Sequence, residues 1–332
     1  MNVRRLISAT ATATALSVGL LSLSACAGSS SATEGKAADG KNAEGKLNVI
    51  ASFYPMQYLA EQIGGDKVAV STLTKPGVEP HDLELKPKQT AELSDADLIL
   101  YLGGLQPAVD EAVKQSGAKA AVDAASLTKT ESHGTESGGH EHGEEEAGHE
   151  GHDHGHAEGA ADPHVWLDPV KYAEIAKGVE KSLAKADPAN AATYQKNATT
   201  LVTKLDGLNT AFKDGLKNTS TKTFITTHAA FGYLAERYGL EQEGISGVAP
   251  ESEPSPARIK QLQKIAKEDE VTTVFFETLV SDKTANTLAR DTGLKTDVLD
   301  PLEGITDKSR GEDYVEVMQS NLAALKKALG AK

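Results

Sequence analysis

Short apolar runs alternate with amphipathic stretches along most of the chain, and this alternation predicts an α/β fold. Residues 47–51, 68–73 and 98–102 have the apolar content of short strands. The segments around 56–63 and 88–95 repeat their apolar positions at helical spacing. Because strand and helix follow each other in turn, we expect a lobe built on a parallel sheet.

The second half of the chain echoes the first. Residues 49–52 align with 224–227, and residues 58–61 align with 233–236, both at an offset of 175. The echo predicts two similar lobes with a cleft between them. Ligands of open parallel sheets bind in the loops beyond the carboxyl ends of the strands, so this cleft is where we expect a site.

Two helical patterns separate the halves. The first covers residues 170–186, and Asp187 followed by Pro188 then has the pattern of an N-cap with proline at the first helical position. Apolar residues continue at helical spacing as far as Leu216. We expect one long, rigid linking helix within 187–218, with about 28 helical residues and a length of about 42 Å at 1.5 Å per residue.

The first 46 residues lie outside this alternating pattern. Residues 1–25 combine two arginines with an apolar run and are interpreted as a lipoprotein signal peptide. Residues 23–26 (LSAC) resemble the lipobox of bacterial lipoproteins, which implies that Cys26 becomes the lipidated N-terminus; the alternative is a secreted protein with a free thiol. Residues 26–46 have the composition of a flexible tether. We therefore expect lipid anchoring in the membrane, on the outer face of the cytoplasmic membrane.

Composition narrows the choice of partners. The 332 residues carry a net charge of −14 and contain no Lys/Arg-rich run, which argues against nucleic acid and anionic membrane surfaces as partners. An acidic balance suits a cationic ligand, although it also serves solubility. The single cysteine excludes an intramolecular disulfide. Length and pattern together predict an N-terminal lobe at 47–186 and a C-terminal lobe at 219–332.

A His-rich insertion interrupts the N-terminal lobe at residues 129–161. Residues 131–161 contain seven His and nine Asp or Glu, with no Val, Leu, Ile or aromatic residue, so we expect the segment to be disordered. Its closely spaced histidines predict auxiliary, weak metal binding, and a solvated linker is the alternative interpretation. The auxiliary candidates are His140, His142, His152, His154 and His156.

Three histidines remain outside this insertion: His81, His164 and His228. His164 stands in DPHVWLDP at 162–169, where a proline at each end restricts the backbone. His81 and His228 each follow a predicted strand. A zinc site needs three or four N, S or O ligands, and we predict that these three imidazoles meet at one Zn²⁺. The best candidate for a fourth ligand is Glu303, and the weaker ones are Glu79, Glu277, Asp300 or a water molecule.

Five stretches of this chain resemble the metal-binding lipoproteins of bacterial ABC importers, in their zinc branch. They are GVEPHD at 77–82, DPHVWLDP at 162–169, THAAFGY at 227–233, ESEPSP at 251–256 and DPLEG at 300–304. The resemblance implies two α/β lobes joined by a long rigid helix, with the metal between them. It carries ligand roles onto His81, His164, His228 and Glu303. Asp300 stands where the family commonly has Asn.

The predicted function is therefore the capture of Zn²⁺ outside the cytoplasm and its delivery to an ABC permease by a monomeric solute-binding protein. Three imidazoles favour Zn²⁺, whereas a carboxylate in place of the third would suit Mn²⁺. The alternatives are a manganese or iron solute-binding protein or an adhesin of the same fold, and a surface zinc hydrolase. The chain has no His-Glu-x-x-His and no Gly-x-Ser-x-Gly motif, so we expect no enzyme. Because protons compete for imidazole, zinc affinity should fall below about pH 6.5.

Overall fold

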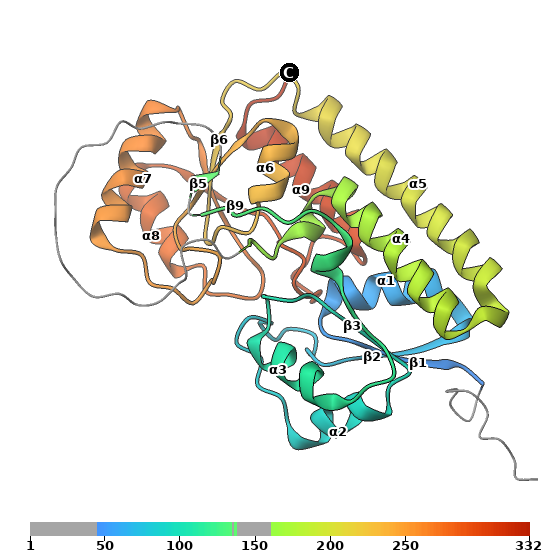
Figure 1. The fold of residues 1–332 in the computed structure, drawn as a ribbon. Helices are drawn as coiled ribbons and strands as arrows, with labels where there is room; N and C mark the ends of the chain where they lie inside the picture. Colours follow the sequence, from blue (N-terminus) through green and yellow to red (C-terminus); the bar gives the residue numbers. More distant parts are fainter. Residues whose placement is uncertain (1–44, 135, 138–160) are drawn as a thin grey trace, which may run out of the picture. The chain divides into compact units, whose positions relative to one another are not determined.

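The computed structural model describes residues 45–134, 136–137 and 161–332 (Figure 1). The predicted signal peptide, Cys26 and nearly all of the predicted tether lie outside these residues, as do His140, His142, His152, His154 and His156. In the part of the chain that is described, no helix combines the length and the apolar content needed to cross a bilayer.

The first lobe is built on a four-stranded, fully parallel sheet in the order β2-β1-β3-β4. Its strands are β1 (Leu47–Ala51), β2 (Val68–Thr72), β3 (Leu98–Tyr101) and β4 (Ala121–Asp123). Its helices are α1 (Tyr54–Gly64), α2 (Pro87–Asp95) and α3 (Pro107–Ser116). The three predicted strands and two predicted helices of this lobe are confirmed; α3 and β4 were not predicted.

The second lobe repeats this topology. Strands β6 (Thr223–Thr226), β7 (Glu241–Gly244), β8 (Thr273–Phe276) and β9 (Lys295–Val298) are parallel in the order β7-β6-β8-β9, which matches β2-β1-β3-β4 strand for strand. Its helices are α6 (Gly232–Tyr238), α7 (Pro256–Glu268), α8 (Lys283–Thr292) and α9 (Tyr314–Ala328). The α/β class with two similar lobes is therefore confirmed.

One edge of the second sheet differs from the predicted parallel architecture. Strand β5 (Glu136–Ser137) pairs antiparallel with β7, with Glu136 opposite Glu243. These two residues come from the insertion for which we predicted disorder. The expectation therefore does not hold for Glu131, Glu136 and Ser137, because Glu136 and Ser137 pair with β7 and the Glu131 amide donates to the Tyr233 hydroxyl of α6 at 2.8 Å.

Two packed helices connect the lobes. Helix α4 (Pro169–Ala186) begins with Asp168, whose carboxylate accepts from the amide of Val170 at 2.9 Å. The long helix α5 (Ala191–Gly215) is shorter than the predicted 187–218, because residues 188–190 form a separate 3₁₀ turn. Asp187 does not cap α5. Its carboxylate instead accepts from the side chains of Asn190 and Tyr194 at 2.6 and 2.9 Å.

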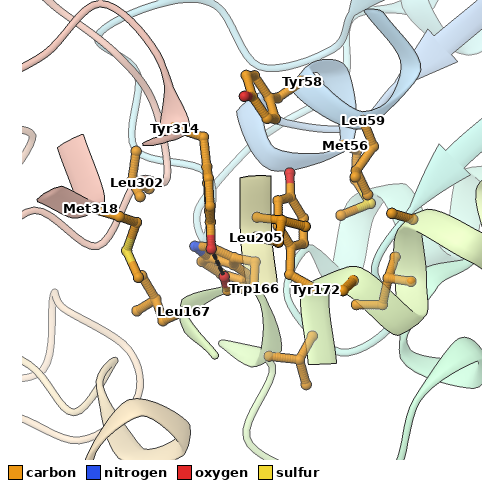
Figure 2. Close-up of a cluster of buried hydrophobic side chains, with 14 of the residues drawn as sticks. Met56, Tyr58, Leu59, Trp166, Leu167, Tyr172, Leu205, Leu302, Tyr314 and Met318 are labelled. Carbon is orange, nitrogen blue, oxygen red and sulfur yellow. Dashed lines mark hydrogen bonds between the residues drawn. The ribbon is translucent and has the colours of Figure 1, made fainter. Parts of the chain in front are cut away.

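The main core joins elements of both lobes (Figure 2). Tyr58 and Tyr172 pack against Tyr314 of α9, with ring centroids 5.6 and 4.5 Å from the Tyr314 ring. Leu205 of α5 and Trp166 are buried in the same cluster. Two smaller cores lie on the other faces of the sheets, one beneath α2 and α3 and one beneath α7 and α8. The central core fixes the loops at the carboxyl ends of both sheets, where the predicted ligands lie.

Candidate metal centre

His164 is held by a short, cross-linked segment. The Asp162 carboxylate accepts from the His164 backbone amide at 2.9 Å and lies 2.7 Å from its ring Nδ1. Two residues further on, the indole of the fully buried Trp166 donates to the carbonyl of Pro301 at 2.7 Å. The Tyr314 hydroxyl donates to the Trp166 carbonyl at 2.5 Å. These bonds fix the DPHVWLDP segment against the loop that carries Glu303.

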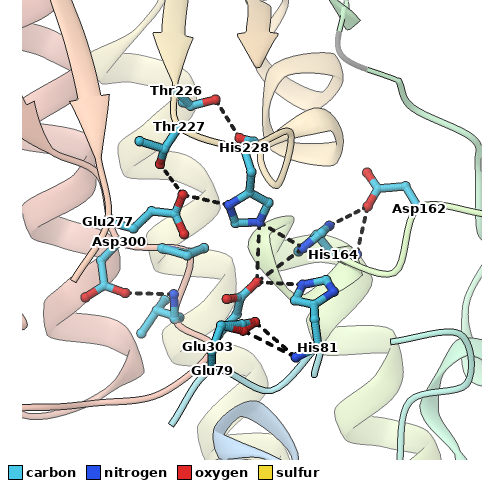
Figure 3. Close-up of polar contacts among 12 residues, drawn as sticks. Glu79, His81, Asp162, His164, Thr226, Thr227, His228, Glu277, Asp300 and Glu303 are labelled. Atoms are coloured by element: carbon cyan, nitrogen blue, oxygen red, sulfur yellow. Dashed lines mark hydrogen bonds and ion pairs between the residues drawn. The ribbon is translucent and has the colours of Figure 1, made fainter. Parts of the chain in front are cut away.

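His228 follows strand β6 by two residues, at the carboxyl end of the second sheet. Its carbonyl accepts from the Thr226 hydroxyl at 2.7 Å, and its Nδ1 lies 2.6 Å from Glu277 Oε1 (Figure 3). The Thr227 hydroxyl donates to the same oxygen of Glu277. Glu277 directly follows β8, so neighbouring parallel strands deliver the ring and the carboxylate that orients it.

His81 comes from the irregular loop between β2 and α2 in the first lobe. The backbone amide of His81 donates to the Glu79 carboxylate at 3.0 Å. The Gln106 amide donates to the neighbouring Pro80 carbonyl at 3.2 Å. Both bonds anchor the Pro80–His81 peptide link, directly before the imidazole. His81 is the least buried member of the group, with 10% of its side chain exposed.

Glu303 lies in the loop after β9, at the end of a tight turn. Leu302 has a φ of 60°, a left-handed conformation that is rare for a side chain of this kind. The Asp300 carboxylate accepts from the Leu302 amide at 2.9 Å and from the hydroxyls of Thr278 and Ser309 at 3.1 and 2.9 Å. This turn aims the fully buried Glu303 side chain at the three imidazoles.

One oxygen of Glu303 is surrounded by all three rings (Figure 3). The distances from Glu303 Oε1 to the Nε2 atoms of His81, His164 and His228 are 3.2, 3.3 and 3.5 Å. The Nε2 atoms of His164 and His228 lie 3.4 Å apart. Ligands about 2.0–2.2 Å from a tetrahedral Zn²⁺ are separated by about 3.3–3.6 Å, the bond length multiplied by about 1.63. The observed separations agree with the edges of such a tetrahedron.

The electrostatics of the group favour a cation. Burial alone raises the pKa of Glu303, but hydrogen bonds from the three imidazoles outweigh it and hold the pKa well below its usual range. Burial lowers the pKa of His228, yet Glu277 and Glu303 reverse this and hold it well above the usual value. The pKa of His164 is raised in the same way, by Asp162 and Glu303 against burial. Positive charge is therefore stabilised at this point, whether protons or a metal ion supply it.

A buried oxygen without a partner points in the same direction. Within the described part of the chain, Glu303 Oε2 and Glu277 Oε2 are buried and accept no hydrogen bond. Leaving a buried carboxylate oxygen unsatisfied is costly, and a metal ligand is one of the few roles that explains it. The donor set of three imidazoles and one carboxylate fits Zn²⁺.

Comparison with known proteins identifies the family. Residues 49–328 match the profile of ZnuA, the periplasmic component A of a zinc-uptake complex. The chain belongs to this family. The zinc-uptake protein ZnuA of Bacillus subtilis is 39% identical over 291 residues, which cover 86% of this chain and 89% of the relative.

Two further relatives come from Streptococcus pneumoniae. Its zinc-binding lipoprotein AdcA is 37% identical over 289 residues, which cover 85% of this chain but only 56% of the relative. This chain therefore matches about half the length of AdcA. The crystal structure of the Zn(II)-bound ZnuA-like domain of AdcA is 34% identical, with a TM-score of 0.70, and covers 86% of this chain and 99% of that domain. The predicted resemblance to the zinc branch is confirmed.

In this ZnuA-family chain the weaker candidates for a fourth ligand make other contacts. Glu79 accepts from the His81 amide, Glu277 orients His228, and Asp300 holds the turn before Glu303. Sequence reasoning did not assign a role to Asp162, which fixes the His164 ring. The proline that follows Asp162, at the start of the motif, was the available signal that this residue is held in one conformation.

Proposed function

We propose that the protein captures Zn²⁺ with His81, His164, His228 and Glu303 and delivers it to the permease of an ABC importer. The observation that carries the proposal is the convergence of three Nε2 atoms on one oxygen of Glu303, at 3.2–3.5 Å. Membership of the ZnuA family and the Zn(II)-bound AdcA domain support zinc as the cargo.

The four ligands are oriented before any ion arrives. Asp162 and Glu277 each hold the Nδ1 side of a ring, which leaves Nε2 as the coordinating atom. Such carboxylate–histidine pairs raise the basicity of the ligand and fix its orientation. Zinc binding then requires the imidazoles to lose their protons, but it does not require the side chains to reorient. His81, the most exposed of the four, marks the side from which an ion would reach the cage.

A transport role fits the coordination better than catalysis does. Catalytic zinc keeps an open position for water or substrate, with three protein ligands. Four converging protein ligands, three of them fully buried, leave no such position. The protein is therefore proposed not to be an enzyme.

Membrane attachment belongs to the same proposal. Cys26, in the lipobox-like sequence, would carry the lipid, and residues 26–46 would tether a monomer to the outer face of the cytoplasmic membrane. The pneumococcal relative is itself named a lipoprotein. The histidines of the insertion (His140, His142, His152, His154 and His156) would hold zinc weakly near the cage.

Complementation tests the transport role. In medium in which a chelator keeps free zinc low, a strain that lacks the gene should take up zinc when the wild-type chain is restored. The same strain supplied with the His228→Ala variant should not. His149→Ala, in the insertion, is the matched control and should restore uptake. If the purified wild-type protein binds zinc but its restoration does not change zinc uptake by the strain, the adhesin alternative would be favoured. Restored uptake of manganese but not zinc would favour the manganese alternative.

A further inference from the structure

The two ends of the His-rich insertion are tied together beside the metal centre. The Asp162 amide donates to the Glu131 carbonyl at 2.8 Å, so the chain leaves and returns at one point. The Tyr233 hydroxyl lies 2.8 Å from the Glu131 amide and 2.9 Å from the Asp162 carbonyl. This junction places His133 next to helix α6.

His133 occupies a fitted position at this junction. Its ring packs edge-on against Tyr233, with centroids 4.6 Å apart, and 10% of its side chain is exposed. A Cβ on Gly232 would lie 2.5 Å from His133 Cγ, so the absence of a side chain at 232 makes room for the imidazole. His133 is therefore a packed residue of the fold, in contrast to the disorder expected for this segment.

The Asp162 carboxylate is shared between two imidazoles. Its Oδ1 lies 2.7 Å from His164 Nδ1, and its Oδ2 lies 2.8 Å from His133 Nδ1. Asp162 is 1% exposed, and Figure 3 shows it on the side of His164 away from Glu303. His133 is thus held through Nδ1 in the way that metal-binding histidines are held, with Nε2 left as the coordinating atom.

One carboxylate lies against this Nε2 atom, and a second lies near the ring. Glu236 Oε2 of helix α6 lies 3.3 Å from it, and ligand atoms of Glu131, His133 and Glu236 all lie within 4.8 Å of one another. Lys129 Nζ and Lys171 Nζ also approach Glu131, at 3.0 and 3.7 Å from Oε1. These lysines would compete with a cation for Glu131, so any ion here should bind more weakly than in the buried cage.

We propose that Glu131, His133 and Glu236 bind a second divalent cation of the Zn²⁺ class, joined through Asp162 to the centre around Glu303. One imidazole and two carboxylates provide three ligands, and water would complete the coordination. The site lies where the His-rich insertion meets the fold. It would therefore hold an ion between the weak histidines of the insertion and the cage. The ligand set does not depend on the transport role.

A variant with few histidines tests this site. In the full-length chain, the six histidines between residues 138 and 160 are replaced by Gln, which leaves His81, His133, His164 and His228. Zinc titration against a chromophoric chelator should show two equivalents, one tight and one weaker. Adding His133→Gln should remove the weaker equivalent. In ¹⁵N-histidine spectra the His133 signals should shift only in the weaker phase.

Glu236→Gln provides a second test, on a side chain that is 56% exposed. It should weaken the second phase at least about tenfold while the tight phase stays within about threefold. Glu268→Gln, also on an exposed helical position, is the matched control and should change neither phase.

Two results would overturn the assignment. One is a single equivalent in the variant that retains His133; the other is a second phase that either His133→Gln or Glu236→Gln leaves unchanged. The tight phase reports separately on the cage, so failure of the transport proposal is distinguishable from failure of the second site.

Discussion

At the scale of the residue, the centre is defined by which nitrogen of each imidazole is free. Asp162 and Glu277 bind the Nδ1 atoms of His164 and His228, and the Nε2 atoms meet at Glu303. The histidines of the centre were predictable from the sequence, because His81 and His228 each follow a predicted strand and His164 lies between two prolines. Glu303 was also the preferred candidate for the fourth ligand. The role of Glu277 was not predictable, because it too follows a strand of the same sheet. Only the folded contacts show that Glu277 orients His228, while the turn held by Asp300 directs Glu303 to the centre.

Substitution of the third imidazole should change metal preference. In His228→Glu a carboxylate replaces a nitrogen ligand, and harder oxygen ligands suit Mn²⁺ better. We expect the zinc-to-manganese affinity ratio to fall by about tenfold or more, measured by competitive titration of the purified variant. His149→Glu, with the same chemical change in the insertion, should leave the ratio of the tight site unaltered. An unchanged ratio in His228→Glu would count against His228 as a ligand.

Removal of an orienting carboxylate should weaken zinc binding without removing a ligand. Glu277→Gln retains size but loses the charge that fixes His228, and changes of this kind cost about 10- to 100-fold in metal affinity. Asp300→Asn is the matched control, because the side-chain oxygen of Asn can still accept from the Leu302 amide and hold the turn before Glu303, so affinity should change by less than about threefold. Calorimetric titration measures both variants. Equal effects of the two substitutions would refute the positioning role of Glu277.

At the scale of the element, periodicity predicted which helices and strands exist better than it predicted the residues at which they begin and end. The 3₁₀ turn at residues 188–190 shows why, since Asp187 uses its carboxylate for Asn190 and Tyr194 instead of the helix amides. Strand β5 was missed because Glu136 and Ser137 carry no apolar pattern, and only pairing with β7 makes them a strand. Both differences arise from tertiary contacts that are absent from the local sequence.

Helix α5 should contribute to stability through its buried face. Leu205 is fully buried in the central core, so Leu205→Ala should lower the free energy of unfolding by about 2–5 kcal/mol. Lys204→Ala, on the exposed face one residue earlier, should change it by no more than about 0.5 kcal/mol. Urea unfolding of the zinc-free proteins measures both. A similar effect of the two substitutions would show that α5 is not packed as described.

At the scale of the whole molecule, duplication explains why distant residues meet. The order β2-β1-β3-β4 recurs as β7-β6-β8-β9, and the loops at the carboxyl ends of the two sheets carry His81 on one side and His228 and Glu303 on the other. The internal echo at an offset of 175 made this architecture predictable. The contacts of the insertion with α6 and β7 were not predictable, because His133 has no distinguishing pattern among the histidines around it.

Zinc should stabilise the protein more at pH 8 than at pH 6. In the zinc-free fold the pKa values of His164 and His228 are raised, so their contribution to stability is present below about pH 6.5 and is lost as pH rises through the folded values. Burial and the charge of Glu303 raise the pKa of Glu79 to about 8. Ionisation of Glu79 therefore also lowers the stability of the zinc-free protein as the pH rises toward 8. Zinc replaces the imidazole protons, so its affinity rises with pH.

Thermal unfolding with and without zinc measures this effect. The zinc-induced rise in Tm should grow from pH 6 to pH 8, and zinc affinity should increase by about tenfold or more between pH 5.5 and 7.5. A rise in Tm that is the same at both pH values would indicate that carboxylates alone hold the ion.

A crystal structure of the zinc-loaded protein, with anomalous scattering measured at the zinc edge, tests the central claim most directly. We predict a strong anomalous peak about 2.0–2.2 Å from the Nε2 atoms of His81, His164 and His228 and from a carboxylate oxygen of Glu303. A fully loaded crystal with no peak among these four side chains, and zinc held elsewhere on the chain, would contradict the account.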